Sequence, residues 1–534
     1  MKTSDSSKPN KATKRVAIGL VIVLAVLALG GVVLSRVAEK KLHTALADIP
    51  GAQIDFKGVN FSPILGNLKL RDVTIALRDS TGAGPGIEGR IEAVELERLS
   101  WKSLIHGEAS AKRLLIREPL VQIVLAGKKA EKKDTAAPSA KASFLKKVSL
   151  SELQVEKGGI GLDSRDNPMK VSAQGITFSV RDIGLLLEEN RVEYNDSIYS
   201  FALDSLDYID AAGLSRIRMG HLATADAGPV KAQALHLYNC VSQEEVAERM
   251  GKVSAMWFDV KVDTLVTSPL NLPRMVRDEH VEVDSVYLSG PDIILFQDDR
   301  YPPAVPYDTF QEGLNKLKIP LLIKQIDARI KAFTFIWETT HINRGTFPMH
   351  EVRIAISSVS NAPGNLMKMG IKSGNDQHGR LNLSLLVRNN KEESTQGSMK
   401  ISGLDAARLD TFVRPLFGAT AMADIHQIDC TFKGDKHQMT EDFCMQYDNL
   451  TLHAWNDSSA PYRIVAKSSG FVSFLANMAV ANSNPSKAGK EPKKVEVTFE
   501  RDPMTPYPSY IIQNLTMGML RTVLPGGSVR KAKK

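Results

Sequence analysis

The chain has 534 residues, of which 43% are hydrophobic, 24% charged and 6% aromatic, a composition typical of a folded body. Its formal net charge of +8 comes from the two ends, because residues 1–15 and residues 525–534 each contribute +4 and the rest is neutral. A neutral body with short basic ends argues against a nucleic-acid-binding protein and favours contact of the ends with a membrane surface.

The N-terminal region contains a run of uncharged residues, 16–35, that is long enough to cross a membrane. A helix of this length rises about 30 Å, which matches the hydrocarbon core of a bilayer. More basic residues precede the run than follow it, so the positive-inside rule predicts a cytoplasmic N-terminus. A cleaved signal peptide is the alternative, but its apolar run is usually about 7–15 residues long. We therefore expect a cytoplasmic basic tail at 1–15, a transmembrane signal anchor at 16–36 and a body beyond the membrane.

Residues 37–126 are expected to contain a short helix and then a first group of strands. Between residues 68 and 77 apolar side chains alternate with polar ones, as a half-buried strand requires. The alternation changes phase at Arg71 and Asp72, which predicts a β-bulge or a tight bend there.

Related patterns recur along the chain, and together they predict a mainly β protein built by repetition. One pair of related segments places a proline, Pro119 or Pro291, between two short strands, where the missing N–H group does no harm. The three pairs are residues 68–75 with 148–155, residues 116–123 with 288–295, and residues 169–180 with 349–359.

Helical patterns are few and short. Ser242 and Glu245 form a capping box that predicts a helix as far as about Met250. Asp308 and Asp405 each predict the first turn of another short helix. The last helix is expected at residues 509–524, with one broad apolar face made of Ile511, Ile512, Leu515, Met519, Leu520 and Val523.

Composition divides the body into segments. Two stretches rich in Lys, Ala and Ser, at 127–144 and 482–494, are expected to be mobile linkers. The Pro-rich residues 301–307 are expected to separate an N-terminal from a C-terminal group of strands. The expected order is a second β segment at 145–300, the connector and its helix at 301–325, a C-terminal β segment at 326–481, and a final strand, helix and basic tail at 495–534.

The sequence offers no catalytic, metal or cofactor site. Its histidines are scattered without metal-ligand spacing, and no nucleophile elbow or phosphate-binding loop is present. Asp298 and Asp299 are adjacent, so on a strand they would point to opposite faces, and a solvated loop edge is the simpler interpretation. Cys430 and Cys444 could bridge neighbouring strands in an oxidising compartment, or they could be two buried unpaired thiols.

This order of features resembles the AsmA-like family of envelope proteins of Gram-negative bacteria. The resemblance rests on residues 60–75, 114–123, 404–435 and 499–502 and covers nearly the whole chain. It implies a single-pass inner-membrane protein with a periplasmic body, in which an elongated antiparallel β-sheet curls along its length into an apolar groove. It also implies a role in outer-membrane biogenesis, with phospholipid as cargo, and with the inner membrane and periplasmic or outer-membrane proteins as partners.

Inside such a groove, alternate side chains of the strands would face inward. From the pattern alone a closed sandwich core is an equal alternative, because an apolar sheet face can be covered by a second sheet or by a ligand. The groove predicts a lipid-handling protein, and the closed core predicts a structural or assembly factor of the envelope. An enzyme is the third possibility, but it needs convergent polar residues that the sequence does not offer. The candidate groove residues are Leu68, Leu70, Val73, Ile75, Val121, Ile123, Ile293 and Leu295.

Overall fold

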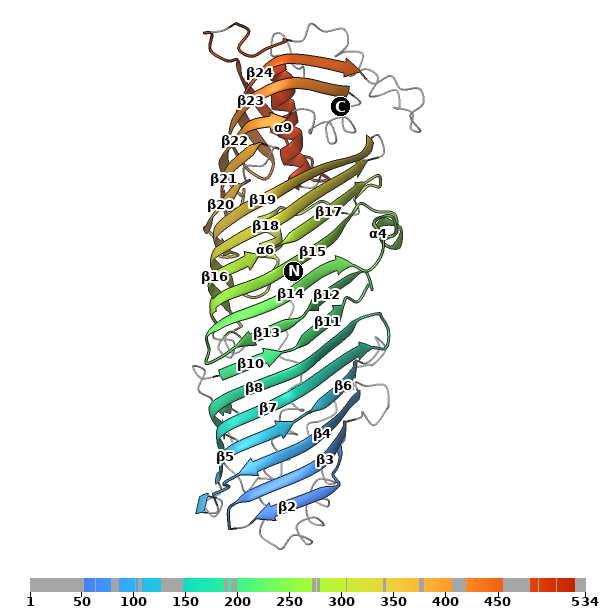
Figure 1. Cartoon of the computed structure of the whole chain (residues 1–534), viewed down its shortest axis with the longest axis vertical. Helices are drawn as coiled ribbons and strands as arrows, with labels where there is room; N and C mark the ends of the chain where they lie inside the picture. The colour runs from blue at the N-terminus through green and yellow to red at the C-terminus, as the bar shows by residue number, and fades with distance from the viewer. Residues whose placement is uncertain are drawn as a thin grey trace, which may run out of the picture. The chain divides into compact units, whose positions relative to one another are not determined.

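The protein is described by a computed structural model, shown in Figure 1. The expected cytoplasmic tail, anchor and first helix lie outside the described residues, as do the linker at 127–144, the helix expected after Asp405 and the C-terminal basic tail. No helix within the described part of the chain is long and apolar enough to cross a membrane. The structure describes residues 52–62, 64–77, 86–100, 102–103, 108–125, 147–186, 191–193, 199–270, 275, 279–303, 305–339, 342–373, 379–405, 419–454, 481–487, 489–505 and 507–523.

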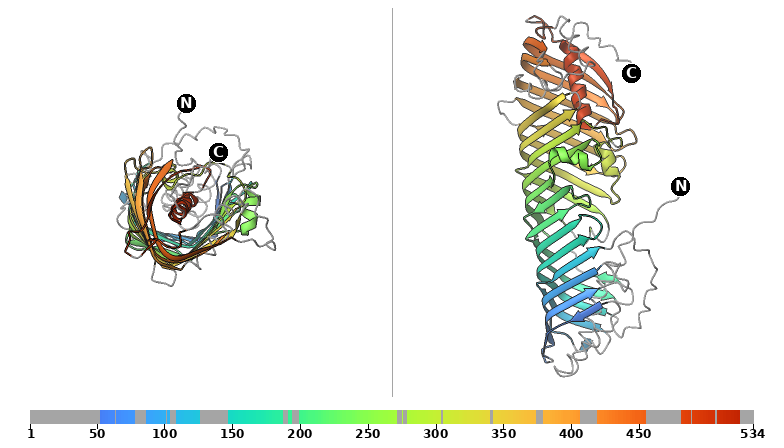
Figure 2. Two further views of the ribbon diagram at one scale, coloured as in Figure 1. Left: turned by 90° about the horizontal axis from the view of Figure 1, so that it is seen from above. Right: turned by 90° about the vertical axis from the view of Figure 1, so that its right-hand side faces the viewer.

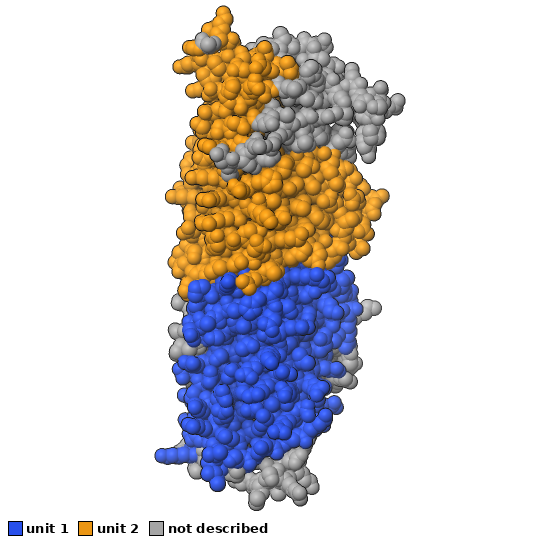
Figure 3. Space-filling view, in the orientation of Figure 1, with its two compact units in different colours: residues 1–232, 271–273 blue, residues 233–270, 274–534 orange. Residues whose placement is uncertain are grey.

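The described residues are mainly in β-strands, as predicted, and they divide into two compact units (Figure 3). Unit 1 comprises residues 1–232 and 271–273, and unit 2 comprises residues 233–270 and 274–534. The boundary therefore falls within a strand, and the Pro-rich segment that we expected to be the divider lies inside unit 2.

Unit 1 contains the strands β1 (Ala52–Asp55), β2 (Gly58–Ser62), β3 (Asn67–Leu77), β4 (Gly86–Glu97), β5 (Glu108–Arg117), β6 (Leu120–Leu125), β7 (Lys147–Ser164), β8 (Lys170–Leu186), β9 (Arg191–Glu193), β10 (Tyr199–Leu203), β11 (Ser205–Ile209), β12 (Ser215–Met219), β13 (His221–Thr224) and the start of β14 (Pro229–Asn239). Unit 2 contains the rest of β14, then α4 (Gln243–Arg249), β15 (Ala255–Pro269), β16 (Val281–Ser289), β17 (Asp292–Asp299), α6 (Phe310–Asn315), β18 (Leu321–Thr339), β19 (Ile342–Ser360), β20 (Leu366–Lys372), β21 (Arg380–Arg388), β22 (Thr395–Asp405), β23 (Ala419–Gly434), β24 (Gln438–Ala454), β25 (Lys494–Glu500) and α9 (Tyr507–Val523).

Most neighbouring strands are antiparallel, but the sheet is mixed, which corrects the expectation of a purely antiparallel one. β5 and β6 both pair with β7 in parallel, and β16 and β17 both pair with β18 in parallel. Parallel neighbours need a crossover connection instead of a tight turn. The Pro-rich connector between β17 and β18 is one such crossover.

The repetition seen in the sequence is confirmed by the topology. Pro119 lies between β5 and β6, and Pro291 lies between β16 and β17, so each proline splits a strand into two halves. In both places the two halves pair with one long following strand, β7 or β18, and that strand pairs antiparallel with the next, β8 or β19. Each unit therefore contains one copy of the same arrangement.

The predicted interruption at Arg71 and Asp72 is a bend. Asp72 has a left-handed φ of 50°, and it is left out of the β3–β4 ladder although Arg71 and Val73 on either side are paired. Neighbouring strands are interrupted in the same way, at Glu118 (φ 47°), Lys157 (φ 52°) and Gly175 (φ 69°). A side chain at Gly175 would clash, since a Cβ there would lie 2.0 Å from Oδ2 of Asp204. These residues form a line of bends across unit 1, which we call the seam.

The described helices agree with their sequence signals in most respects. The capping box of Ser242 and Glu245 is present at the start of α4. α6 also begins with a capping box, but its cap is Thr309 and not Asp308, because the Thr309 hydroxyl accepts from the Glu312 N–H while the Glu312 carboxylate accepts from the Thr309 N–H. α9 is present near the predicted bounds, and in unit 2 it lies on the concave side of the strands (Figure 2).

The expected mobile linker at 482–494 is in part tied to β24. The side chain of Asn484 is buried and donates to the carbonyl groups of Met445 and Lys493, at 2.6 and 3.1 Å. The backbones of Asn484 and Tyr447 also exchange two hydrogen bonds. Composition indicated a loop correctly, but it did not reveal that one buried amide would anchor this loop.

Candidate functional site

One face of the sheet in unit 1 carries continuous rows of apolar side chains. Directly paired residues lie on the same face of a sheet, so register partners define each row. One row runs through Ile54, Ile75, Gly89, Val121, Ile160 and Ala173, and a second runs through Ile87, Ile123, Leu162 and Val171. On the other side of the seam, further rows contain Leu68, Leu96, Leu114 and Leu153, and Leu70, Val94, Ile116 and Val155. We call this side of the sheet the apolar face.

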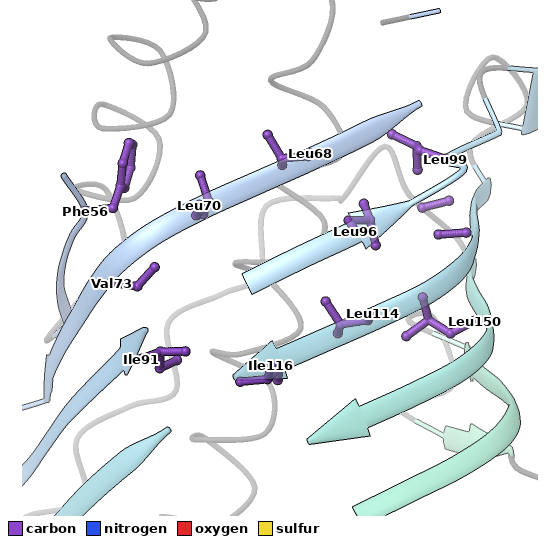
Figure 4. Packing of buried hydrophobic residues seen from close by; sticks show 12 residues of the cluster. Phe56, Leu68, Leu70, Val73, Ile91, Leu96, Leu99, Leu114, Ile116 and Leu150 are labelled. Carbon is purple, nitrogen blue, oxygen red and sulfur yellow. The ribbon is translucent and has the colours of Figure 1, made fainter. Parts of the chain in front are cut away.

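The apolar face has a closed part and an open part, and the closed part extends past the seam to Val73 and Ile91. In the closed part Leu70 and Leu114 are 2% and 1% exposed, and they belong to the main core cluster of unit 1 (Figure 4). In the open part Val121 is half-buried and Ile160 is 43% exposed, although both are on the same face. The apolar face of unit 1 is therefore a packed core over part of its area and an accessible surface around Val121 and Ile160.

The eight candidate groove residues separate along this division. Leu68, Leu70 and Val73 are core residues, whose side chains already pack against their own unit. The other five, Ile75, Val121, Ile123, Ile293 and Leu295, are half-buried.

A cavity of about 1260 Å³ lies on unit 1 beside the seam. Its lining includes Ile75, Val121 and Ile160, three members of one row, but most of its lining residues, among them Leu120 and Gln122, alternate with that row and belong to the opposite face. Gly89 separates Ile75 from Val121 in that row, so the absence of a side chain there leaves room between them. The volume exceeds the roughly 300–1,000 Å³ typical of pockets for small molecules.

The charged groups along this cavity do not form an anion site. The lining contains four acidic residues, Asp55, Glu88, Glu118 and Asp204, against two basic ones, Arg90 and Lys157. Arg90 also lies 3.3 Å from the carboxylate of Asp72. The cavity therefore suits an uncharged apolar ligand better than a phosphate group.

In unit 2, Ile293 and Leu295 of β17 occupy similar rows. Ile293 pairs with Val260 and Phe333, and Leu295 pairs with Phe258 and Phe335. Both candidates pack beside aromatic side chains, and Leu295 adjoins the small cluster of Phe335 and Trp337.

The end of β17 holds a polar cluster that the sequence did not predict. Asp298 is 1% exposed and accepts two hydrogen bonds from the guanidinium group of Arg300, at 2.9 and 2.8 Å. Asp299 accepts on its two oxygens from Ser254 (2.8 Å) and Trp337 (2.7 Å). The expectation of a solvated loop edge was therefore wrong for Asp298.

This cluster attaches the Pro-rich connector to the sheet. Tyr307 of the connector donates to the Ser254 hydroxyl at 2.6 Å, and burial raises the pKa of Tyr307. The two carboxylates have separate partners, as adjacent strand residues should, so they do not form a metal or acid pair. No group of three or more His, Cys, Asp and Glu residues in the described ranges is placed to hold a metal ion. The position of Arg300, two residues after Asp298, is the local signal that could have indicated a buried ion pair.

The two cysteines considered as a disulfide are free and buried. In the β23–β24 ladder Cys430 pairs with Phe443, and Cys444 pairs with Asp429, so the two thiols lie on opposite faces of the sheet. A disulfide between them is excluded by this register, and the alternative of two unpaired thiols is correct. Burial raises the pKa of both thiols, which makes them poor nucleophiles.

We therefore expect the stability of the protein not to depend on reductant. In a Cys240→Ser variant, which removes the exposed thiol, the unfolding midpoint should be the same with and without dithiothreitol. A lower midpoint in reductant, together with a mass two daltons below the fully reduced value, would show that Cys430 and Cys444 do pair.

Comparison of the chain with models of known protein families gives no match, and comparison with curated proteins gives none either.

Proposed function

We propose that the chain is an AsmA-like envelope protein, anchored in the inner membrane by residues 16–36, that holds phospholipid acyl chains on the open part of its apolar face. The observation that carries this proposal is the accessible apolar pair of Val121 and Ile160, which are register partners on the apolar face and are half-buried and 43% exposed, respectively. The proposed place of action is the periplasm, in outer-membrane biogenesis.

The hydrophobic effect gives the physical reason. Transfer of one methylene group from water to an apolar surface is favourable by about 0.8 kcal/mol. An acyl chain is therefore stabilised by each apolar side chain that it contacts. Successive strands present apolar partners in register, from Ile54 on β1 to Ala173 on β8. A chain lying across the strands would therefore meet apolar side chains along its length.

A structural or assembly factor of the envelope is the second candidate. The closed part of the apolar face favours it, because Leu70 and Leu114 are already fully packed and leave no room for a ligand there. This candidate predicts that the purified protein carries protein partners and no enriched lipid.

The experiment that separates the two is mass spectrometry of lipids bound to the full chain after extraction in detergent. We expect phospholipid to co-purify and Ile160→Lys to reduce the bound amount at least several-fold, because a charged side chain in the open row opposes an acyl chain. The matched control is Ser151→Lys, since Ser151 is an exposed residue of the same strand, β7, and is not among the residues that line the cavity. That exposed position should tolerate lysine with bound lipid unchanged.

Folding of both variants is checked by circular dichroism and thermal unfolding. Equal lipid loading of wild type, Ile160→Lys and Ser151→Lys would contradict the assignment to this row. A folded wild-type protein without enriched lipid would contradict the lipid-handling function altogether.

A further inference from the structure

α9 covers part of the apolar face of unit 2. Its contacts are with β24 and β25, and Leu515, Met517 and Met519 pack against the main core cluster of the unit. One face of α9 is buried along its length. It is formed by four residues spaced by about one helical turn, Tyr510, Asn514, Gly518 and Thr522. The helix therefore meets the sheet through polar side chains and a glycine as well as through apolar side chains.

Gly518 allows this close approach. A Cβ at this position would lie 2.6 Å from Cγ of Phe443 and 2.7 Å from Oε1 of Glu441. Both contacts are too short for a real side chain, so the middle of α9 rests directly on β24.

The interface includes a carboxyl group with incomplete hydrogen bonding. Glu441 is 2% exposed, and its Oε2 accepts a bond from the Cys430 thiol at 3.4 Å. Among the described residues, neither Oε1 of Glu441 nor either polar atom of the Asn514 amide has a hydrogen-bond partner. Each such buried group costs about 1–3 kcal/mol.

No charged group of the packed elements compensates Glu441. On β23 and β25 its register partners are Phe432 and Val497, and the titratable group that faces it is the Cys430 thiol. The charged residues of β25, Lys494, Glu496 and Glu500, alternate onto the other face. On α9, the residue next to Glu441 is Gly518. The charged residue Arg521 of that helix instead donates to the carbonyl of Glu496 at 2.8 Å.

The two ends of α9 form hydrogen bonds with the rest of unit 2. Tyr510 donates to the carbonyl of Phe499 at 3.2 Å, and Lys493 donates to the carbonyls of Arg521 and Thr522 at 2.8 and 3.3 Å. An ammonium group at the last carbonyls of a helix is a favourable cap. The weak point of the interface is therefore the buried carboxyl group.

We propose that α9 is a releasable cover of the apolar face of unit 2, which stays docked while Glu441 is protonated and is released when Glu441 ionises. Release uncovers apolar side chains that α9 now covers, including Phe443 of β24. The inference goes beyond the proposed function, since it concerns unit 2 and does not require that lipid binds to unit 1.

The direction of the pH dependence follows from the burial. Desolvation raises the pKa of Glu441 to about 7, from the ordinary value of 4.5 that it would have once α9 has left. A carboxyl group with a raised pKa stabilises the docked state below about pH 4.5, and that stabilisation is lost as the pH rises to about 7. The equilibrium between docked and released α9 should shift by up to about two orders of magnitude across this range.

The test is hydrogen exchange of the α9 peptide, residues 507–523, in the full chain at pH 4.5 and pH 8. After correction for intrinsic rates, the wild-type peptide should be protected at pH 4.5 and exchange at least tenfold faster at pH 8. Glu441→Gln keeps the shape of the side chain without its charge, so its α9 should stay protected at both values. The matched control is Glu393→Gln, because Glu393 is a buried carboxyl group of the same unit, bonded to Thr309 beside α6.

Peptides from β18 and β19 report on unit 2 as a whole. If these strands stay protected while α9 opens, and Glu393→Gln behaves as wild type, the cover is released as proposed. Equal protection of α9 in wild type and Glu441→Gln at pH 8 would overturn the proposal. Simultaneous loss of protection in β18 and β19 would also overturn it, because it would show unfolding of the unit.

Discussion

Replacing Phe443 by alanine should lower the free energy of unfolding of unit 2 by about 3–5 kcal/mol. Phe443 is fully buried in the main core cluster of that unit, between its register partners Cys430 and Val495. Gly518 of α9 lies directly above the ring, so removing the ring leaves a cavity that the rigid strands cannot close. This is a large part of the stability of a typical domain.

The effect is measured by hydrogen exchange of β23 and β24 in the full chain at increasing urea concentration. Phe310→Ala is the matched control, since Phe310 is 51% exposed at the start of α6. This substitution should lower the free energy of unfolding by less than about 1 kcal/mol. A loss for Phe443→Ala no larger than that of the control would show that the core of unit 2 is not built around this ring.

Leu114→Ala should destabilise unit 1 by about 2–5 kcal/mol. Leu114 is 1% exposed, and its register partners on β4 and β7 are Leu96 and Leu153. It lies in the closed part of the apolar face, where the side chains pack against one another and no ligand is needed to cover them. The readout is the free energy of unfolding from hydrogen exchange of β4, β5 and β7.

Leu120→Ala is the comparison for this variant. Leu120 belongs to β6, the second half of the same split strand, but it is 57% exposed. Leu120→Ala should lower the free energy of unfolding only slightly. The two variants together test whether Leu114 is buried and Leu120 is exposed, as they are in the structure. Leu120 adjoins Val121 of the apolar face and so lies on the opposite face, and similar losses for both leucines would contradict the burial that the structure gives to Leu114.

Local sequence signals predicted much of the secondary structure. The alternation in residues 68–77 predicted β3, the phase change at Asp72 predicted the bend, and the alignment of Pro119 with Pro291 predicted two split strands. These signals succeed because each depends on a few neighbouring residues, through the period of the strand or the missing N–H group of proline. The capping box at Ser242 succeeded for the same reason.

The candidate site could be predicted only in part. The sequence identified Leu70 and Val121 alike as inward-facing residues, but one is core and the other is half-exposed. The patterns of the two residues are equivalent, and the difference arises from what packs above them. The contacts of Asp299 with Ser254 and Trp337 were missed because these residues come from three parts of the chain.

The sequence by itself determined that this protein is mainly β, where its strands bend and split, and where several of its helices begin, because these features depend on local periodicity and backbone chemistry. The tertiary structure decided which strands pair in parallel, which part of the apolar face is closed, and that Cys430 and Cys444 point apart. It also decided that Glu441 lies buried beneath α9, about seventy residues further along the chain. Burial and register are set by contacts between distant segments, and the free energy of a buried charge depends on those contacts and not on its neighbours in sequence.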